Sequence, residues 1–248
     1  MGRAGLAGGA AVARGLTAQA ARPTRPFDRA AARAIAHAFA PPRPFGNRWD
    51  YHYARIKLST DPLYPGVLAA LRGARAPLLD LGCGLGLLAH ALRGDDQRMA
   101  YLGVDNDAGK IVRARRAADN AALTDLAFET VDLAAGLPAH RGSVAILDVL
   151  QFVAPQAQDD ILDGAIAMLE PGARLVIRTC FDDGGKRARI TRHMDALSRW
   201  LGWMNAGPKR YPDPDALRAR FEAAELRCAF APLYGSTPFN NWLVVAER

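Results

Sequence analysis

The most constraining feature of this 248-residue chain is a glycine-rich turn that joins an apolar segment to an amphipathic one. Residues 77–81 read PLLDL, residues 82–86 read GCGLG, and GLLAHALRG follows at 86–94. A short apolar run bounded by turn residues is typical of a strand buried on both faces. Glycines let the backbone turn tightly and approach a ligand closely. The unpaired N–H groups at the start of the next helix favour a nucleotide-like ligand there.

Predicted strands and helices alternate through the middle of the chain. We expect strands at 77–81, 99–104, 126–131, 143–150 and 173–180, and helices at 86–94, 107–123 and 155–170. This alternation predicts an α/β fold, a parallel sheet with helices on both faces. We expect the rest of the chain to form a long basic helix at 182–204, a helix at 213–226, and strands at 227–234 and 240–248.

The N-terminal quarter has a different character. Residues 1–25 are dominated by Ala, Gly and Arg and are predicted to be a disordered tail. Residues 26–74 are predicted to form an N-terminal helical cap, with one helix over 28–40 and another from 62 to about 72. The net charge of +7 is concentrated here, since residues 1–57 hold ten basic and two acidic side chains. Such a segment either binds an acidic or phosphate-bearing partner or is an ordinary solvated surface.

Composition narrows the remaining function classes. No apolar run is long enough for a membrane-spanning helix, so we expect none. Cys83, Cys180 and Cys228 are odd in number and far apart, which predicts neither a disulfide framework nor a metal site. Unpaired cysteines suit a reducing compartment, so we expect a cytoplasmic location.

A second acidic residue, Asp105, limits further which class of ligand the glycine turn could bind. Asp105 ends the predicted strand in LGVDND, 19 residues beyond Gly86, the offset expected for a carboxylate that binds ribose hydroxyls. Dinucleotide sites use G-x-G-x-x-G at a pyrophosphate, whereas here the spacing is G-x-G-x-G with Asp80 two residues before Gly82. A carboxylate at Asp80 would repel a pyrophosphate and attract an ammonium group. A ligand with adenine, ribose and an amino-acid tail meets both requirements, and S-adenosylmethionine is such a ligand.

With these motifs, residues 75–180 resemble a class I S-adenosylmethionine-dependent methyltransferase. The matching segments are DLGCGLG, GVDND, VDL at 131–133, ILDVLQFV at 146–153 and LEPGARLVIRT at 169–179. The closing WLVVAER resembles the antiparallel last strand of that family. The resemblance implies a Rossmann-like, doubly wound, seven-stranded sheet with an antiparallel last strand. It also implies a cofactor-binding methyltransferase domain over 75–248, with an insert at 182–212 near the substrate site.

The resemblance also implies roles for individual residues. Asp80 would approach the methionine part of the cofactor, Asp105 the ribose, and Asp132 the adenine amino group with Leu133 beside it. The remaining cofactor-binding candidates are Gly82, Cys83, Gly84, Gly86, Asn106, Asp148 and Gln151. Purely structural roles stay open for Asp80, Asp132 and Asp148, which could cap turns or satisfy loop amides. Cys83 is expected to be a small filler rather than a nucleophile, because no basic partner stands near it in the sequence.

The sequence says less about the acceptor, the molecule that would receive the methyl group. The aromatic and basic stretch 48–64 and the insert 182–212 are expected to line its site, with Arg55 and Lys57 among the positive charges. His52, His193 and Tyr53 are the candidates for a catalytic group. No N-P-P-Y/F motif follows the fourth predicted strand, which disfavours amide and base-amine methylation.

These observations predict methylation of a small aromatic or acyl, polyketide-like molecule at oxygen or carbon. The arrangement of RWDYHYARIKLSTDPLY (48–64) before the glycine turn and LDVLQF (147–152) after it also resembles methyltransferases of bacterial aryl polyene and related pigment clusters. This resemblance implies secondary metabolism and an aromatic or acyl acceptor, either free or tethered to an acidic acyl carrier protein. A nucleic-acid or protein methyltransferase and a non-catalytic cofactor-binding protein remain alternatives. A nucleic-acid partner is not expected, since no recognisable RNA-binding element is present.

Overall fold

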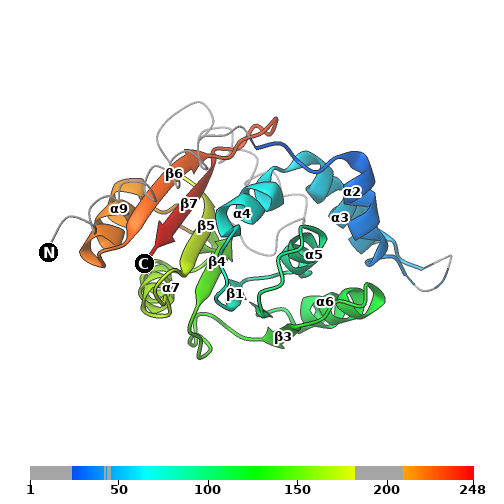
Figure 1. The fold of residues 1–248 in the computed structure, drawn as a ribbon, viewed down its shortest axis with the longest axis horizontal. Helices are drawn as coiled ribbons and strands as arrows, with labels where there is room; N and C mark the ends of the chain where they lie inside the picture. Colours follow the sequence, from blue (N-terminus) through cyan, green and yellow to red (C-terminus); the bar gives the residue numbers. More distant parts are fainter. Residues whose placement is uncertain (1–23, 42, 44–45, 182–208) are drawn as a thin grey trace, which may run out of the picture.

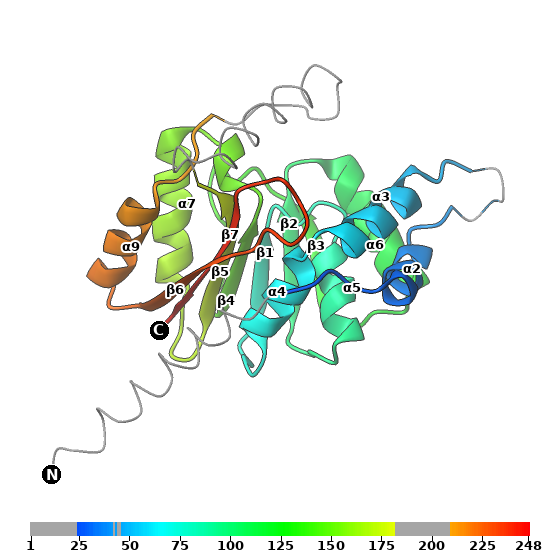
Figure 2. The same cartoon turned by 90° about the horizontal axis from the view of Figure 1, so that it is seen from above.

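The computed structural model describes residues 24–41, 43, 46–181 and 209–248 (Figures 1 and 2). Most of the predicted tail 1–25 and all of the predicted helix 182–204 lie outside these residues. Of the helices in the described ranges, none has the length and apolar character needed to cross a membrane.

The centre of the molecule is a seven-stranded sheet in the order β3-β2-β1-β4-β5-β7-β6. The strands are β1 Leu78–Leu81, β2 Tyr101–Asp105, β3 Leu126–Thr130, β4 Ser143–Leu147, β5 Arg174–Cys180, β6 Arg227–Pro232 and β7 Asn241–Glu247. Strands β1 to β5 pair in parallel, and β7 runs antiparallel to both β5 and β6. The predicted seven-stranded sheet with an antiparallel last strand is confirmed.

Helices cover both faces of this sheet (Figure 2). One face carries α4 Leu63–Leu71, α5 Leu87–Gly94 and α6 Ala108–Asn120, and the other carries α7 Pro155–Ala167 and α9 Pro214–Ala223. Both faces of strand β1 are apolar and need to be covered. Leu78 packs in the core beneath α4 to α6, whereas Leu79 and Leu81 pack in the core beneath α7 and α9. A strand buried on both faces has no polar alternation, which explains the apolar run in the sequence.

Two further helices, α2 Arg29–His37 and α3 Trp49–Thr60, lie beside α5 and α6 (Figure 1). The carboxylate of Asp28 caps α2 by accepting hydrogen bonds from the N–H groups of Ala30 and Ala31. Asp50 of α3 pairs with Arg113 of α6 at 2.8 Å and holds α3 against the sheet domain. The boundary at residue 74 between a cap and a domain stays a prediction.

One strand is shorter than its sequence indicates. The apolar stretch 143–150 predicts an eight-residue strand, but β4 ends at Leu147 and a short 3-10 helix, η1 Leu150–Phe152, follows. The backbone leaves the strand at Asp148, whose φ of 61° is in the left-handed region. Hydrophobicity continues across this bend, so the apolar pattern gives no sign of it. The bend turns Asp148 to Val153 across the end of the sheet.

Candidate active site

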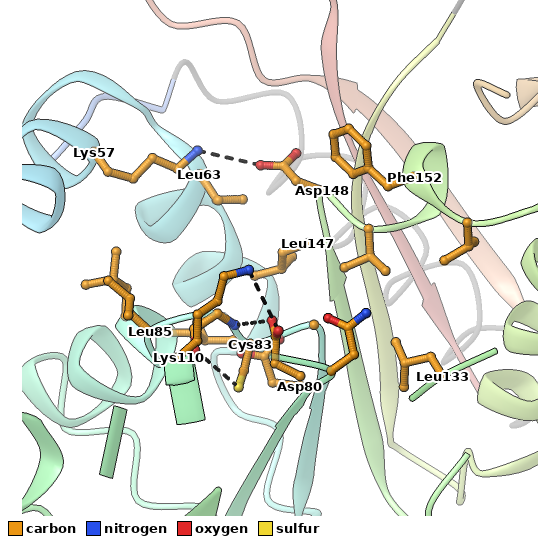
Figure 3. A pocket seen from close by; sticks show the side chains of 18 of the residues that line it. Lys57, Leu63, Asp80, Cys83, Leu85, Lys110, Leu133, Leu147, Asp148 and Phe152 are labelled. Atoms are coloured by element: carbon orange, nitrogen blue, oxygen red, sulfur yellow. Dashed lines mark hydrogen bonds and ion pairs between the residues drawn. The ribbon is translucent and has the colours of Figure 1, made fainter. Parts of the chain in front are cut away.

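A cavity of about 630 Å³ lies at the carboxyl ends of β1, β2 and β4. Neighbouring strands β1 and β4 mark the point at which the strand order reverses, where open α/β sheets bind their ligands. Helices α3 and α4 contribute Tyr53, Lys57 and Tyr64 to the cavity wall. Figure 3 shows Lys57 and Asp148 at one end of the cavity and Asp80, Cys83 and Lys110 at the other. We call these the acceptor end and the cofactor end.

The glycine turn forms the floor of the cofactor end. Gly82, Gly84 and Gly86 have φ values of 80°, 57° and 75°, which disfavour any residue with a Cβ. A Cβ on Gly82 would lie 2.3 Å from Val149 Cγ2, and one on Gly86 would lie 2.6 Å from the Phe128 ring. A Cβ on Gly84 would meet no described atom within 4 Å outside the neighbouring residues, and Gly84 lines the cavity. Gly84 therefore keeps space open for a ligand, whereas Gly86 is required by packing and does not line the cavity.

Asp80 is the most buried carboxylate of the cavity, with 2% of its surface exposed. Its Oδ2 accepts a hydrogen bond from the Tyr101 hydroxyl at 2.6 Å. No described residue pairs with its buried Oδ1. Burial, together with the charge of Asp105, raises the pKa of Asp80 to about 7 against the opposing Tyr101 hydrogen bond. An unpaired buried carboxylate oxygen is costly, and it fits a ligand that brings a cationic N–H donor.

Asp105 ties the turn together from the end of β2. Its Oδ2 accepts a hydrogen bond from the Gly84 N–H and its Oδ1 from the Asp107 N–H, both at 3.0 Å. Lys110 Nζ lies 3.8 Å from Oδ1. Each carboxylate oxygen can accept a further hydrogen bond. Asp105 is therefore suited both to fix the shape of the glycine turn and to bind hydroxyl groups of a ligand.

The other predicted cofactor residues at this end also line the cavity. Asn106, Asp132 and Leu133 are among its lining residues, and Asp132 also accepts a hydrogen bond from the Ala134 N–H at 3.0 Å. Burial raises the pKa of the Cys83 thiol, so it stays protonated. Its Sγ lies 3.0 Å from where a Cβ on Gly103 would stand. These contacts support a packing role for Cys83 beside the ligand and argue against a nucleophile.

A four-residue ion network, which we call the Asp148 network, closes the acceptor end. Arg178 of β5 contacts Asp148 Oδ2 directly and lies 3.1 Å from Asp61 Oδ2. Lys57 Nζ lies 2.6 Å from Asp61 Oδ2 and 3.5 Å from Asp148 Oδ2. Burial alone would raise the pKa of Asp148, but Arg178 and Lys57 outweigh it and hold this pKa below its usual value.

Asp61 and Arg178 were not predicted from the sequence as residues of this site. One signal was available: Arg178 interrupts the apolar strand RLVIRTC, and a buried arginine needs a carboxylate partner. Which carboxylates would meet it could not be read from the sequence, because Asp61 lies 117 positions away.

The catalytic candidates from the sequence and Gln151 lie in different places. Tyr53 lines the cavity, but His52 is exposed on α3 beside Tyr51 and is not among the lining residues. Gln151 is buried behind the cavity wall, where it accepts a hydrogen bond from the Thr179 hydroxyl at 3.4 Å. Gln151 belongs to η1, which follows the bend at Asp148, and it is not among the residues that line the cavity. His193 lies outside the described residues.

Comparison with known proteins defines the class. A family model described as a methyltransferase domain matches residues 73–209, more than half of the chain. The chain belongs to this methyltransferase-domain family, and the resemblance to class I S-adenosylmethionine-dependent methyltransferases is confirmed. S-adenosylmethionine is the cofactor of this class, in agreement with the unpaired Asp80 oxygen and the open space over Gly84.

Individual relatives are more distant. The chain is similar to a ubiquinone biosynthesis O-methyltransferase of Xylella fastidiosa, with 29% identity over 136 residues. That match covers 53% of each protein, so the chain spans about half the length of the curated relatives it matches.

Solved structures share the fold. An O-methyltransferase family protein from Burkholderia thailandensis has a TM-score of 0.57 and 19% identity, covering 85% of this chain and 63% of that one. Magnesium protoporphyrin IX methyltransferase from Synechocystis PCC 6803, solved with bound SAH, has a TM-score of 0.56 and 16% identity, covering 86% and 92%.

Proposed function

We propose that this chain transfers a methyl group from S-adenosylmethionine to an oxygen atom of a small, hydroxylated aromatic molecule. The observation that carries the proposal is the cofactor end of the cavity. A buried, unpaired carboxylate oxygen at Asp80 and a half-satisfied carboxylate at Asp105 lie on either side of an open glycine turn.

In the proposal, each residue of this end binds a different part of the cofactor. Asp80 binds the ammonium group, Asp105 the ribose hydroxyls, and Asp132 with Leu133 the adenine. When bound, the cofactor supplies an electrophilic methyl group on a sulfonium. The chain's own task is to hold the acceptor in line and exclude water, and the buried side chains of the cavity wall, among them Leu63, Tyr64 and Leu85, are suited to both.

The acceptor end supports an aromatic substrate. Tyr53, Tyr64 and Phe152 line it, and flat acceptors pack well against aromatic side chains. The curated relative is named as an O-methyltransferase, which favours oxygen as the accepting atom. An acyl acceptor on a carrier protein, a role in secondary metabolism and a cytoplasmic location remain predictions from the sequence.

Calorimetric titration with S-adenosylmethionine tests the proposal. We expect the wild type to bind and Asp105→Ala to bind about five- to 150-fold more weakly, because about 1–3 kcal/mol of charge-assisted hydrogen bonding is lost. Asp119→Ala removes an exposed carboxylate on α6 and should bind like the wild type. No binding by the folded wild type at millimolar cofactor would end the proposal.

A transfer assay separates the alternatives. Formation of S-adenosylhomocysteine is followed with hydroxylated aromatics, with acyl thioesters, and with RNA and protein fractions. The proposal expects turnover with the aromatics. Turnover confined to macromolecules would favour the alternative based on the basic N-terminal segment, and cofactor binding without any turnover would favour a non-catalytic protein.

A further inference from the structure

Lys57 and Asp148 present opposite charges side by side on the wall of the acceptor end. Both line the cavity, and their charged atoms are 3.5 Å apart (Figure 3). Lys57 comes from α3 and Asp148 from the bend after β4, so the pair exists only in the folded protein. Asp61 and Arg178 stand behind the pair and do not line the cavity.

Each member of the pair has bonding capacity left over. Among its three N–H donors, Lys57 uses one for Asp61 Oδ2 and directs a longer contact to Asp148 Oδ2. Arg178 and Lys57 both meet Asp148 at Oδ2, and no described residue donates a hydrogen bond to Oδ1. The cavity therefore offers a cationic donor next to an anionic acceptor.

The side chains around the pair keep both groups charged. Burial works against the charge on both groups, but Arg178 from β5 and Lys57 from α3 hold the pKa of Asp148 below its usual value. Asp148, Asp61 and Tyr53 raise the pKa of Lys57 against burial and the opposing charge of Arg178. Tyr64 from α4 and Asp80 from β1 also line the cavity. Burial, together with the charge of Asp80, raises the pKa of the Tyr64 hydroxyl. Because the pKa of Lys57 is raised despite burial, Lys57 is a protonated ammonium group here and not a neutral amine.

We propose that Lys57 and Asp148 hold the reacting hydroxyl of the acceptor between them. Lys57 donates a hydrogen bond to the hydroxyl oxygen, and Asp148 Oδ1 accepts the hydroxyl proton. This inference rests on the proposed function and specifies its acceptor as a hydroxyl compound, above all a phenol. Asp61 and Arg178 are positioning residues, because they fix the pair without reaching the cavity.

The step balances. The hydroxyl oxygen forms a bond to the methyl carbon, the bond between that carbon and the sulfonium sulfur breaks, and its electron pair stays on sulfur. The hydroxyl proton passes to Asp148 Oδ1 and from there to water. A carboxylate of low basicity suffices, because an oxygen that has gained a methyl group while keeping its proton is strongly acidic. Asp148 takes this part in the proposal because its carboxylate lines the cavity beside Lys57 and its Oδ1 has no donor among the described residues.

The test is a titration of 4-nitrophenol bound to the complex of the protein with S-adenosylhomocysteine. The phenol and phenolate forms differ in visible absorbance, so the pKa of the bound phenol is measured without turnover. We expect Lys57→Met to raise this pKa by about one unit or more relative to the wild type, and Lys57→Arg to stay near it. Asp148→Asn should lower it, because a negative charge beside the phenolate is removed.

Three controls keep the outcome interpretable. Arg98→Met removes an exposed cation far from the cavity lining and should leave the pKa of bound 4-nitrophenol unchanged. If Lys57→Met alone does not fold, Lys57→Met with Asp61→Asn removes one charge of each sign and should show the same rise. Failure to bind S-adenosylhomocysteine would contradict the proposed function itself.

Two results would overturn the inference while leaving the proposed function standing. One is a complex with S-adenosylhomocysteine that binds no 4-nitrophenol at millimolar concentration. The other is a bound phenol whose pKa is the same in the wild type and in both Lys57 variants. A rise in Lys57→Met that Lys57→Arg reverses, with the opposite change in Asp148→Asn, supports it.

Discussion

The two ends of the cavity use carboxylates in opposite ways. At the cofactor end, Asp80 is buried beside another acid, and its pKa rises to about 7. At the acceptor end Asp148 faces Arg178 and Lys57, and its pKa falls below the usual value despite burial. The protein itself compensates the charge at the acceptor end, whereas at the cofactor end compensation is left to the ligand. We therefore expect a cationic ligand group beside Asp80 and not beside Asp148.

The glycine turn gives the largest expected effect, and it separates folding from binding. Gly82→Ala should lower the free energy of unfolding by about 3 kcal/mol or more, because its Cβ would stand 2.3 Å from Val149 Cγ2 at a positive φ. Gly84→Ala should cost only about 1–2 kcal/mol of backbone strain, since no protein atom is near, but it should abolish cofactor binding. Urea denaturation and calorimetry measure the two quantities. Equal stability losses in both variants would contradict the division of roles between Gly82 and Gly84.

The raised pKa of Asp80 predicts pH-dependent cofactor binding. Only the ionised carboxylate attracts an ammonium group, so affinity should rise about tenfold per pH unit below pH 7 and level off above it. Asp80→Asn should bind weakly at every pH. Calorimetry between pH 5.5 and about 8.5 checks this, with the range chosen to bracket the raised pKa. A flat profile in the wild type would mean that Asp80 does not meet the cofactor's cation.

The same two carboxylates predict opposite stability profiles for the ligand-free protein. Folding raises the pKa of Asp80, so the folded state binds more protons than the unfolded state between pH 3.8 and about 7, and stability falls as pH rises through that window. Folding lowers the pKa of Asp148, so its contribution is present above pH 3.8 and is lost as pH falls below that value. Asp80→Asn should therefore stabilise the ligand-free protein near pH 8 relative to the wild type. Thermal unfolding in the absence of cofactor measures the difference, and a less stable variant at that pH would argue against an ionised, unpaired Asp80.

The cofactor end could be predicted from the sequence because it is local. Asp80, the glycines and Asp105 fall within 26 consecutive residues, and a strand, a turn and a helix in succession leave few ways to arrange them. The alternation of strands and helices could be predicted for the same reason, because each element depends on a local sequence pattern. The bend after Leu147 was missed because apolar residues continue through it, and hydrophobicity does not report a single left-handed backbone angle.

The acceptor end could not be predicted because it is assembled from distant segments. Lys57 and Asp61 come from the end of α3, Asp148 from the bend after β4 and Arg178 from β5, so their meeting depends on how α3 packs and on the sheet order. Composition had suggested positive charge from Arg55 and Lys57 but gave no carboxylate partner. His52 shows the reverse case: its residue type suggested chemistry, but it is exposed on α3 and does not line the cavity.

Asp50 tests whether the two ends are mechanically separate. It joins α3 to α6 through Arg113 at 2.8 Å and Arg116 at 3.8 Å. Asp50→Asn should lower the free energy of unfolding by about 1 kcal/mol, since both arginines are partly exposed and solvent screens the pairs. Because α3 carries Tyr53 and Lys57, we expect weaker 4-nitrophenol binding with unchanged cofactor affinity. An equal loss for both ligands would show that α3 supports the whole cavity.

Asp132 should give the smallest effect, and it tests how far the cofactor end extends. It lines the cavity, but it is exposed and already accepts a hydrogen bond from the Ala134 N–H. Asp132→Asn keeps that acceptor, so the local turn should persist and cofactor affinity should fall only about two- to fivefold. Titration with adenosine isolates the adenine contact from the methionine contact: the variant should lose the same factor for adenosine as for the whole cofactor. A loss above about tenfold would show that Asp132 binds the adenine more strongly than an exposed carboxylate normally does. The cofactor end would then extend past β3.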